Sequence, residues 1–218
     1  MTALHSATVA GLDALSLGDR PLVVCDVDEV VLHFLKPLEA WLDRRSLWLH
    51  AVSYGLTGNI KRKGSADAIP KDDVAQLLID FFDDEVGRQD AVEGAGAALA
   101  NLAGRADVVL LTNVPHHHRD RRMENLAAHG LGFPVVTNDG PKGPALARLA
   151  ARATGPIVFI DDSPTNLKSV LAAVPEVHAI QFVADERFLA LAPDVPGARL
   201  KTNRWPEVET YVAALVAD

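Results

Sequence analysis

Residues 22–32 read Leu22-Val23-Val24-Cys25-Asp26-Val27-Asp28-Glu29-Val30-Val31-Leu32. The first four residues are apolar and rich in β-branched side chains, which predicts a buried strand. Acidic residues follow at once, and because unpaired charges are very costly to bury, the strand must open onto a site at its carboxyl end. Asp26 and Asp28 are two positions apart, so they project to the same side of an extended chain. Since two such carboxylates repel each other, a cation is expected beside them.

A second apolar run also ends in acids, and it reads Ile157-Val158-Phe159-Ile160-Asp161-Asp162-Ser163-Pro164. Two parallel strands with carboxylates at the same edge of a sheet would form an oxygen-lined pocket of the kind that suits Mg2+. Adjacent residues cannot both point inward from a regular strand, so the chain is expected to turn here, with one of Asp161 and Asp162 binding metal through water. The alternative for Asp162 is that it only caps the following helix. Asn166 is expected to support this loop.

Two further polar motifs lie between the acidic runs. Residues 107–112 form a predicted strand that ends in Thr112, which Asn113 follows, and Lys142 comes after a Gly-Pro pair. The Thr112 hydroxyl and the Asn113 backbone N–H are candidates to bind a phosphate oxygen at a helix entrance. Lys142 is a candidate to pair with Asp26 and the phosphate as a point charge. The alternatives are a buried threonine bonded to backbone and a solvated surface lysine.

The four motifs, in this order, resemble those of the haloacid dehalogenase superfamily of phosphotransferases, and they span roughly residues 20–170. The resemblance implies an α/β fold, a Rossmann-like doubly wound parallel sheet of strand order 3-2-1-4-5 with the two acidic strands adjacent at its centre. It also implies a catalytic core formed by residues 1–33 and 91–218. The segment 34–90 between the first two motifs matches the position of a small, mainly helical cap domain.

The periodicity of the remaining chain agrees with a parallel sheet that has helices on both faces. Residues 1–20 predict either a short helix or a loosely packed extension, and residues 51–69 a loop or hairpin. Strands are predicted at 22–25, 107–112, 133–137, 156–161 and 177–183, and helices at 34–50, 70–86, 94–103, 115–129, 143–153, 164–173 and after Pro206.

Each acidic residue has a chemical role in this interpretation. Asp26 is the candidate nucleophile, which would form an aspartyl-phosphate and split one displacement into two. Asp28 is the candidate general acid and base. Mg2+ would be held by Asp26, the backbone carbonyl of Asp28, Asp161 and Asp162. Dehalogenases of the superfamily lack the second aspartate of the first motif, so Asp28 favours phosphoryl transfer over dehalogenation.

The sequence therefore predicts a Mg2+-dependent phosphatase that hydrolyses a small phosphomonoester through an aspartyl-phosphate. One alternative is a phosphomutase of the same superfamily, and another is a non-catalytic phospho-receiver-like signalling module. In the latter case the lysine would not precede the second acid pair, and the chain would be shorter. A degenerate scaffold is a further alternative, but every catalytic position is filled.

Composition limits the partners. The 218 residues carry a net charge of −8, which disfavours nucleic acid, whose binding rests on neutralisation of phosphates by Lys and Arg. The expected partner is a small phosphorylated metabolite. The one cysteine, Cys25, excludes an internal disulfide and, with no signal-peptide pattern, predicts a cytoplasmic setting. No apolar stretch is long enough to span a membrane, and the oligomeric state stays open.

Three clusters of basic residues lie outside these motifs. His116, His117 and His118 follow the threonine motif, and three successive helical positions point in three directions, so they cannot all bind one metal; a solvated or substrate-rim role is expected. The arginines at 119, 121 and 122 predict a solvated face. The basic run at residues 61–63 either binds a second anion of the substrate or forms a solvated loop, and the second interpretation is favoured.

Overall fold

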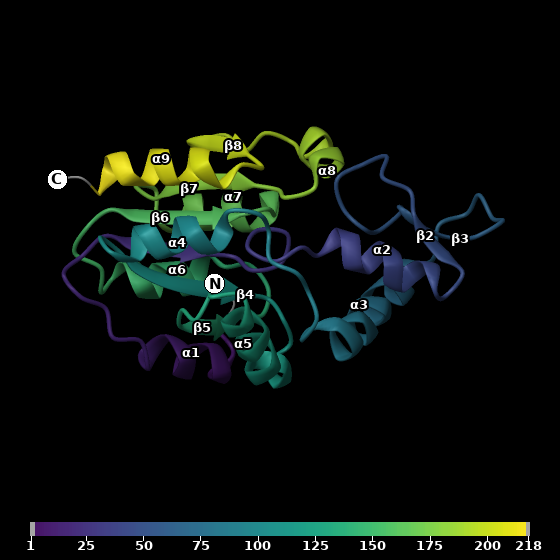
Figure 1. Ribbon diagram of the computed structural model, residues 1–218, viewed down its shortest axis with the longest axis horizontal. Coiled ribbons are helices and arrows are strands. Elements are labelled where there is room, and N and C mark those ends of the chain that lie inside the picture. The colour runs from purple at the N-terminus through teal and green to yellow at the C-terminus, as the bar shows by residue number, and fades with distance from the viewer. Residues whose placement is uncertain (1–2, 217–218) are drawn as a thin grey trace.

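The computed structural model describes residues 3–216 and contains one six-stranded parallel sheet of order β5-β4-β1-β6-β7-β8 (Figure 1). Its strands are β1 (Leu22–Cys25), β4 (Asp107–Thr112), β5 (Val135–Thr137), β6 (Ile157–Asp161), β7 (His178–Phe182) and β8 (Leu200–Thr202). The predicted order 3-2-1-4-5 is confirmed for the first five of these. The sixth strand, β8, was not predicted, because three residues with one fully buried side chain give no periodic signal.

The strand order decides where the site lies. β1 pairs in parallel with β4 on one side and β6 on the other, with Val23 opposite both Val108 and Val158. The motif strands therefore end at the same edge, where open α/β sheets bind their ligands. Doubly wound receiver folds have the order 2-1-3-4-5 instead, so this topology is not that of a phospho-receiver module.

Helices cover both faces of the sheet, which explains why its central strand is apolar throughout. Val23 and Cys25 of β1 face a cluster formed with α4 (Ala95–Ala103), α5 (Arg119–Ala128) and α9 (Trp205–Leu215). Leu22 and Val24 face the opposite cluster, formed with α1 (Ser6–Asp13), α6 (Gly143–Ala150) and α7 (Pro164–Ala173). The N-terminal segment is thus a packed helix, the first of the two predicted alternatives. No helix within residues 3–216 combines the length and apolar character needed to cross a membrane.

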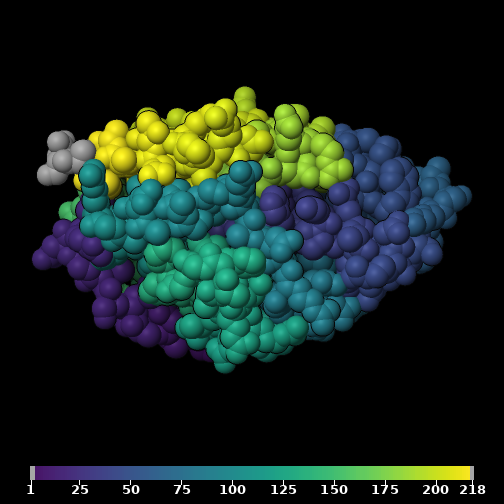
Figure 2. All heavy atoms as spheres, in the orientation of Figure 1, coloured from purple at the N-terminus to yellow at the C-terminus, as the bar shows by residue number. Residues whose placement is uncertain are grey.

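The insert between β1 and α4 projects from the carboxyl edge of the sheet and forms one end of the molecule (Figures 1 and 2). It consists of α2 (Leu35–Asp43), the antiparallel hairpin of β2 (Leu47–Leu49) and β3 (Ile60–Arg62), and α3 (Lys71–Glu85). Its apolar cluster includes Leu38, Trp41 and Phe81, and also Phe188 of α8 (Glu186–Leu191). The insert is therefore packed against the C-terminal part of the chain.

The first helix of the insert is shorter than predicted. We expected a helix over 34–50, but α2 ends at Asp43, and Ser46 has a positive φ of 57° in the turn that leads into β2. In β2 the side chains alternate, with Leu47 and Leu49 buried and Trp48 exposed. This period of two is typical of a half-buried strand, and it explains why the apolar stripe was irregular beyond Leu42. Residues 51–69 contain the connecting loop and the second strand of this hairpin, whose first strand, β2, lies before the predicted range.

Candidate active site

The centre of the site is a buried lysine between two buried aspartates. Lys142 lies at the start of α6, and its Nζ is 2.6 Å from Asp26 Oδ1 and 2.8 Å from Asp161 Oδ2. Both aspartates follow from the strand order, since Asp26 comes directly after β1 and Asp161 ends the neighbouring β6. All three side chains are almost inaccessible to solvent. Lys142 is therefore no solvated surface residue.

The charges of this group are set by burial and by each other. Burial alone would lower the pKa of Lys142, but the carboxylates of Asp161 and Asp26 more than offset it, so the pKa lies above its usual value. Burial raises the pKa of Asp26 to about 7, against the opposing effect of Lys142. Lys142 is thus a permanent cation, whereas ionised Asp26 needs a further positive charge at neutral pH.

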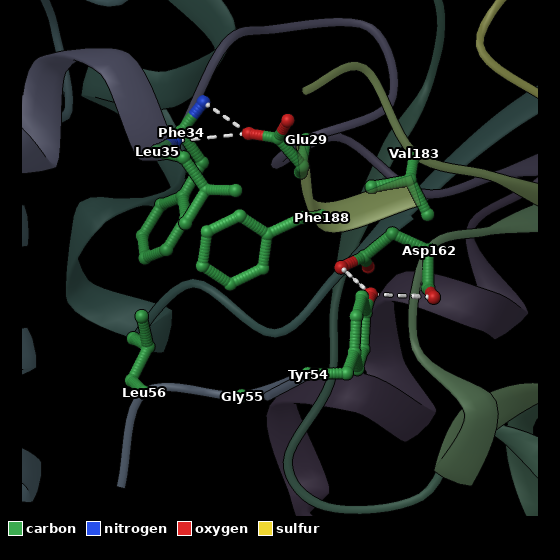
Figure 3. Close-up of a pocket in the computed structure, with 9 residues that line it drawn as sticks. All are labelled: Glu29, Phe34, Leu35, Tyr54, Gly55, Leu56, Asp162, Val183 and Phe188. Atoms are coloured by element: carbon green, nitrogen blue, oxygen red, sulfur yellow. Dashed lines mark hydrogen bonds between the residues drawn. The ribbon is translucent and has the colours of Figure 1, made fainter. Parts of the chain in front are cut away.

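The two aspartates of the second acid pair have different hydrogen-bond partners. Asp161 Oδ1 accepts from the backbone N–H of Ser163 at 2.9 Å and from the Asn166 side chain at 3.1 Å. Asp162 contacts Tyr54, whose hydroxyl group lies 2.8 Å from Asp162 Oδ2 and 2.7 Å from the Asp162 carbonyl oxygen and donates its one hydrogen between them (Figure 3). Ser163 is the N-cap of α7, so Asp162 does not cap that helix. Asn166 supports the loop, as expected.

Asp26, Asp161 and Asp162 each contribute one carboxylate oxygen to a group whose members lie within 4.8 Å of one another. Burial, followed by the charges of Asp161 and Asp26, raises the pKa of Asp162 well above its usual value. Three acids with one neutralising lysine leave an excess of negative charge, and a compact oxygen donor set of this kind fits Mg2+. The residues present therefore fit the predicted metal. The side chain of Asp28 lies outside this group, and only its backbone carbonyl was predicted as a ligand.

Asp28 is held by a buried pair of polar side chains that the sequence analysis did not identify. Its Oδ1 accepts from Arg122 Nη2 at 2.7 Å and from Gln89 Nε2 at 2.9 Å. Arg122 Nη2 also donates to Gln89 Oε1 at 2.7 Å, and both side chains have no exposed surface. The predicted solvated face is therefore wrong for Arg122. The available signal was its helical spacing, since Arg122, Asn125 and Leu126 share the buried face of α5.

Thr112 and Asn113 lie beside this group but are engaged by the protein. The Thr112 hydroxyl accepts from the backbone N–H of Val114 at 3.2 Å and faces Asp28 Oδ2 at 3.5 Å. The Asn113 side chain donates to the carbonyl of Gly140 at 2.9 Å. The next helical turn, η1 (His116–His118), starts only after Pro115, so Asn113 is not at a helix entrance. The Thr112 hydroxyl therefore lies at the strand end next to Asp28. The side chain of Asn113 connects the loop after β4 to the loop that precedes Lys142.

Glu29, the third acid of the first motif, has a structural role. It is 3% exposed and has a positive φ of 64°. Its Oε2 accepts from the backbone N–H groups of Phe34 and Leu35 at 3.1 and 2.9 Å, and its Oε1 from that of Asp185 at 2.6 Å. Burial raises its pKa, although these backbone donors oppose the shift. Glu29 thus joins the start of the insert to the loop before α8.

A cavity of about 480 Å³ lies over the acids, between the sheet edge and the insert. The insert contributes apolar side chains to it, and the sheet edge contributes acids and amides. The lining residues are Asp26, Asp28, Glu29, Phe34, Leu78, Phe82, Asn113, Gly140, Pro141, Asp162, Ser163, Thr165 and Asn166. A smaller pocket beside it, drawn in Figure 3, shares Glu29, Phe34 and Asp162 with this cavity.

The three histidines at residues 116–118 lie outside the group of acids and make contacts elsewhere in the protein. His118 is buried, with its Nε2 2.7 Å from Asp83 Oδ1, and His117 Nε2 is 3.6 Å from the same oxygen. Asp83 belongs to α3, so the two histidines connect the insert to the core. His116 contacts the Thr137 hydroxyl at 2.6 Å. The expected solvated role therefore holds for His117, whose side chain is 65% exposed, but is wrong for the buried His118.

The basic run at residues 61–63 also lies away from the cavity. Lys63 forms an ion pair with Asp43 at the surface, and Arg62 lines a separate pocket between β2 and α3. Cys25 packs in the core, where burial raises the pKa of its thiol, which agrees with an inert side chain.

Comparison with solved structures gives the fold a wider context, although no known family model and no curated protein matches the sequence. A haloacid dehalogenase-like protein of unknown function from Agrobacterium tumefaciens superimposes with a TM-score of 0.65, at 16% identity over 90% of this chain and 99% of that one. A hydrolase of the same family from Deinococcus radiodurans, with bound phosphate and sodium, gives 0.61 at 19% identity over 90% and 96%. A candidate β-phosphoglucomutase from Thermotoga maritima gives 0.57 at 15% identity over 89% and 99%. The chain therefore has the fold of the haloacid dehalogenase superfamily, as its motifs indicate.

Proposed function

We propose that the protein is a Mg2+-dependent phosphatase that hydrolyses a small phosphomonoester through an aspartyl-phosphate. The observation that carries this proposal is the buried group of Asp26, Lys142 and Asp161 at the carboxyl end of the central strand. It joins a carboxylate nucleophile to a fixed cation, which is what transfer of an anionic phosphoryl group requires. The Deinococcus radiodurans neighbour, which holds phosphate, agrees with this class of ligand.

The first step is attack by Asp26 on phosphorus. Its Oδ1 is engaged by the backbone N–H of Val27 at 2.7 Å and by Lys142 at 2.6 Å, which leaves Oδ2 to attack. The bond from phosphorus to the ester oxygen breaks as the new bond to Asp26 forms. Lys142 stabilises the negative charge of the transferring group, and bound Mg2+, held by Asp26, Asp161 and Asp162, would add Lewis-acid stabilisation.

Asp28 acts as the general acid and then as the general base. Arg122 and Gln89 hold its Oδ1, so the proton is carried by Oδ2, the oxygen that faces Thr112. Protonated Asp28 gives this proton to the departing alkoxide. It then takes a proton from the water that attacks phosphorus, the bond between phosphorus and Asp26 breaks, and inorganic phosphate leaves with the nucleophile regenerated.

The residues 34–90 would act as the cap of a core formed by residues 1–33 and 91–218. Two observations support this division: the Tyr54 hydroxyl reaches Asp162, and Phe34, Leu78 and Phe82 line the cavity over the acids. A cap of this kind excludes water and selects the leaving group while the core performs the chemistry. The single cysteine supports the expected cytoplasmic setting, and the substrate would be a small phosphorylated metabolite.

The phosphomutase alternative is favoured by the likeness to the Thermotoga maritima structure. A mutase must hold a second phosphate where the leaving group lies. The cavity wall instead combines four carboxylic acids with apolar and amide side chains, so a second anion would face negative charge and apolar surface. This composition favours hydrolysis.

The test is release of inorganic phosphate from 4-nitrophenyl phosphate with Mg2+, using Asp26→Asn as the control for contaminating activity. We expect turnover in the wild type and none in the variant. Isomerisation of a sugar 1-phosphate with little phosphate release would favour the mutase. Wild-type activity in Asp26→Asn would contradict both assignments.

A further inference from the structure

The small pocket beside the cavity lies where the insert meets the core, and its volume is about 170 Å³ (Figure 3). The insert contributes Phe34, Leu35 and Leu56, and the core contributes Val183 and Phe188. Val183, Phe188 and Leu35 are buried, with 5% exposure or less. Gly55 has a φ of 126°, a conformation that other residues rarely adopt, and it lets the chain turn between Tyr54 and Leu56.

One end of this pocket is polar, and the rest of its wall is apolar except for Glu29. The Tyr54 hydroxyl and the Asp162 carboxylate meet at that end, where Asp162 also borders the larger cavity (Figure 3). The ring of Tyr54 packs edge-on against that of Phe188, with centroids 6.2 Å apart. Glu29 is the second acid in the wall, but its oxygens accept from three backbone N–H groups. The wall therefore suits a group that carries no charge.

We infer that this pocket binds an apolar group about the size of a benzene ring, carried by the leaving alcohol of the substrate. The inference rests on the proposed function, because the phosphate is taken to lie among the acids of the larger cavity. The size argument is direct: an apolar protein cavity of about 150 Å³ binds benzene, and this pocket measures about 170 Å³. A ligand with a phosphate at one end and a ring at the other matches this pocket, because Tyr54 and Asp162 border the metal-binding acids and the oxygens of Glu29 already accept from backbone N–H groups.

The larger cavity points to the same class of substrate. Its insert side is formed by Phe34, Leu78 and Phe82, so the leaving group passes apolar surface on the way to the pocket. Phe34 lines both spaces, as do Glu29 and Asp162, so the two spaces adjoin each other. The substrate class is therefore a phosphomonoester of an alcohol that bears an aryl or compact alkyl group.

The experiment compares benzyl with methyl compounds, as phosphonates for binding and as phosphate esters for turnover. Calorimetry with Mg2+ measures the binding of benzylphosphonate and methylphosphonate, which are not hydrolysed. Kinetics measure kcat/KM for benzyl phosphate and methyl phosphate. Since burial of a ring removes on the order of 100 Å² of apolar surface from water, we expect the benzyl compound to be favoured about tenfold to a hundredfold in both assays.

Two variants locate this preference. Leu56 is half-buried in the pocket wall, so Leu56→Trp should fill the pocket and abolish the benzyl preference while methyl phosphate is still hydrolysed. Leu56→Asp should have the same effect because it places a charge in the pocket. The matched control is Val52→Trp, four residues earlier in the same segment and 58% exposed, which should keep the preference. Thermal denaturation checks that each variant is folded.

The outcomes separate the two proposals. Equal binding of the two phosphonates, or a benzyl preference that survives both Leu56 variants, would overturn the pocket assignment even if both esters are hydrolysed. A phosphonate preference that depends on Leu56, without hydrolysis of either ester, would refute the proposed phosphatase and keep the pocket as a binding site for an apolar group.

Discussion

Replacing Arg122 with methionine tests whether the buried guanidinium orients Asp28. The change removes the 2.7 Å hydrogen bonds to Asp28 Oδ1 and Gln89 Oε1. Hydrogen bonds to charged groups contribute about 1.5–3 kcal/mol each, and breaking a buried ion pair costs about 3–5 kcal/mol. Because Asp28 keeps the Gln89 donor and 17% of its side chain is exposed, we expect the lower end, about 3 kcal/mol. For a chain of this size the Tm should fall by about 6–12 °C.

The effect on catalysis should depend on the leaving group. An alkyl phosphate needs a proton from Asp28 as its alcohol departs, so its kcat should fall about a hundredfold when Asp28 is no longer held. The 4-nitrophenolate group leaves without a proton, so Arg122→Met should still form the aspartyl-phosphate and release a burst of one equivalent of nitrophenolate. Stopped-flow absorbance measures this burst.

The matched control is Arg121→Met on the same helix, whose exposed side chain donates to the carbonyl of Asp83 and is remote from Asp28. It should keep normal kcat on both substrates. If Arg122→Met lost the same factor on the alkyl and aryl esters and showed no burst, the guanidinium would not act through Asp28, and its role would be in stability alone.

Four further predictions follow from the acids and the metal. Exhaustive EDTA treatment should abolish phosphate release and added Mg2+ restore it, whereas Ca2+, which prefers looser coordination, should not; full activity after chelation would contradict the metal assignment. Asp26→Asn should lose turnover with an unchanged circular dichroism spectrum, because an amide is a poor nucleophile. Beryllium fluoride with Mg2+ should raise the Tm of the wild type but not of Lys142→Ala, and equal shifts would remove Lys142 from the phosphate site. Asp162→Asn should raise the Tm of the metal-free protein at pH 7–8. The pKa of Asp162 is raised in the folded protein, so ionisation of its carboxyl group destabilises the fold as the pH rises above about 4. The gain in Tm should vanish below about pH 4, and a gain of equal size there would show that ionisation is not its cause.

The sheet could be predicted because its strands alternate with helices and because each motif strand ends in polar residues. Parallel pairing then brings Asp26 and Asp161 to one edge without any knowledge of side-chain packing. Lys142 follows from the same topology, since the loop before α6 lies at that edge. Short elements such as β8 and α8 carry too few residues for a periodic pattern, and their positions depend on long-range contacts.

The parts of the site that come from helices and from the insert could not be predicted in the same way. Tyr54 reaches Asp162 across 108 positions of sequence, and Gln89 reaches Asp28 across 61. No local pattern specifies such contacts, because they depend on how the insert packs against the core. Arg122 differs in one respect, since its spacing to Leu126 is that of a single helix face, and a charged residue on a buried face needs a buried partner.

The three hydrogen bonds of Glu29 bear on how the chain can be divided. Phe188 and Val183 complete the apolar cluster of the insert, and Glu29 binds the backbone at the start of α2 and at Asp185. Excising residues 34–90 and joining the ends would expose Phe188 and Val183 to water and leave a buried carboxylate without two of its donors. We therefore expect the truncated core to aggregate when expressed alone. The insert begins and ends early in the sequence, yet it cannot finish folding until residues 183–188 have left the ribosome.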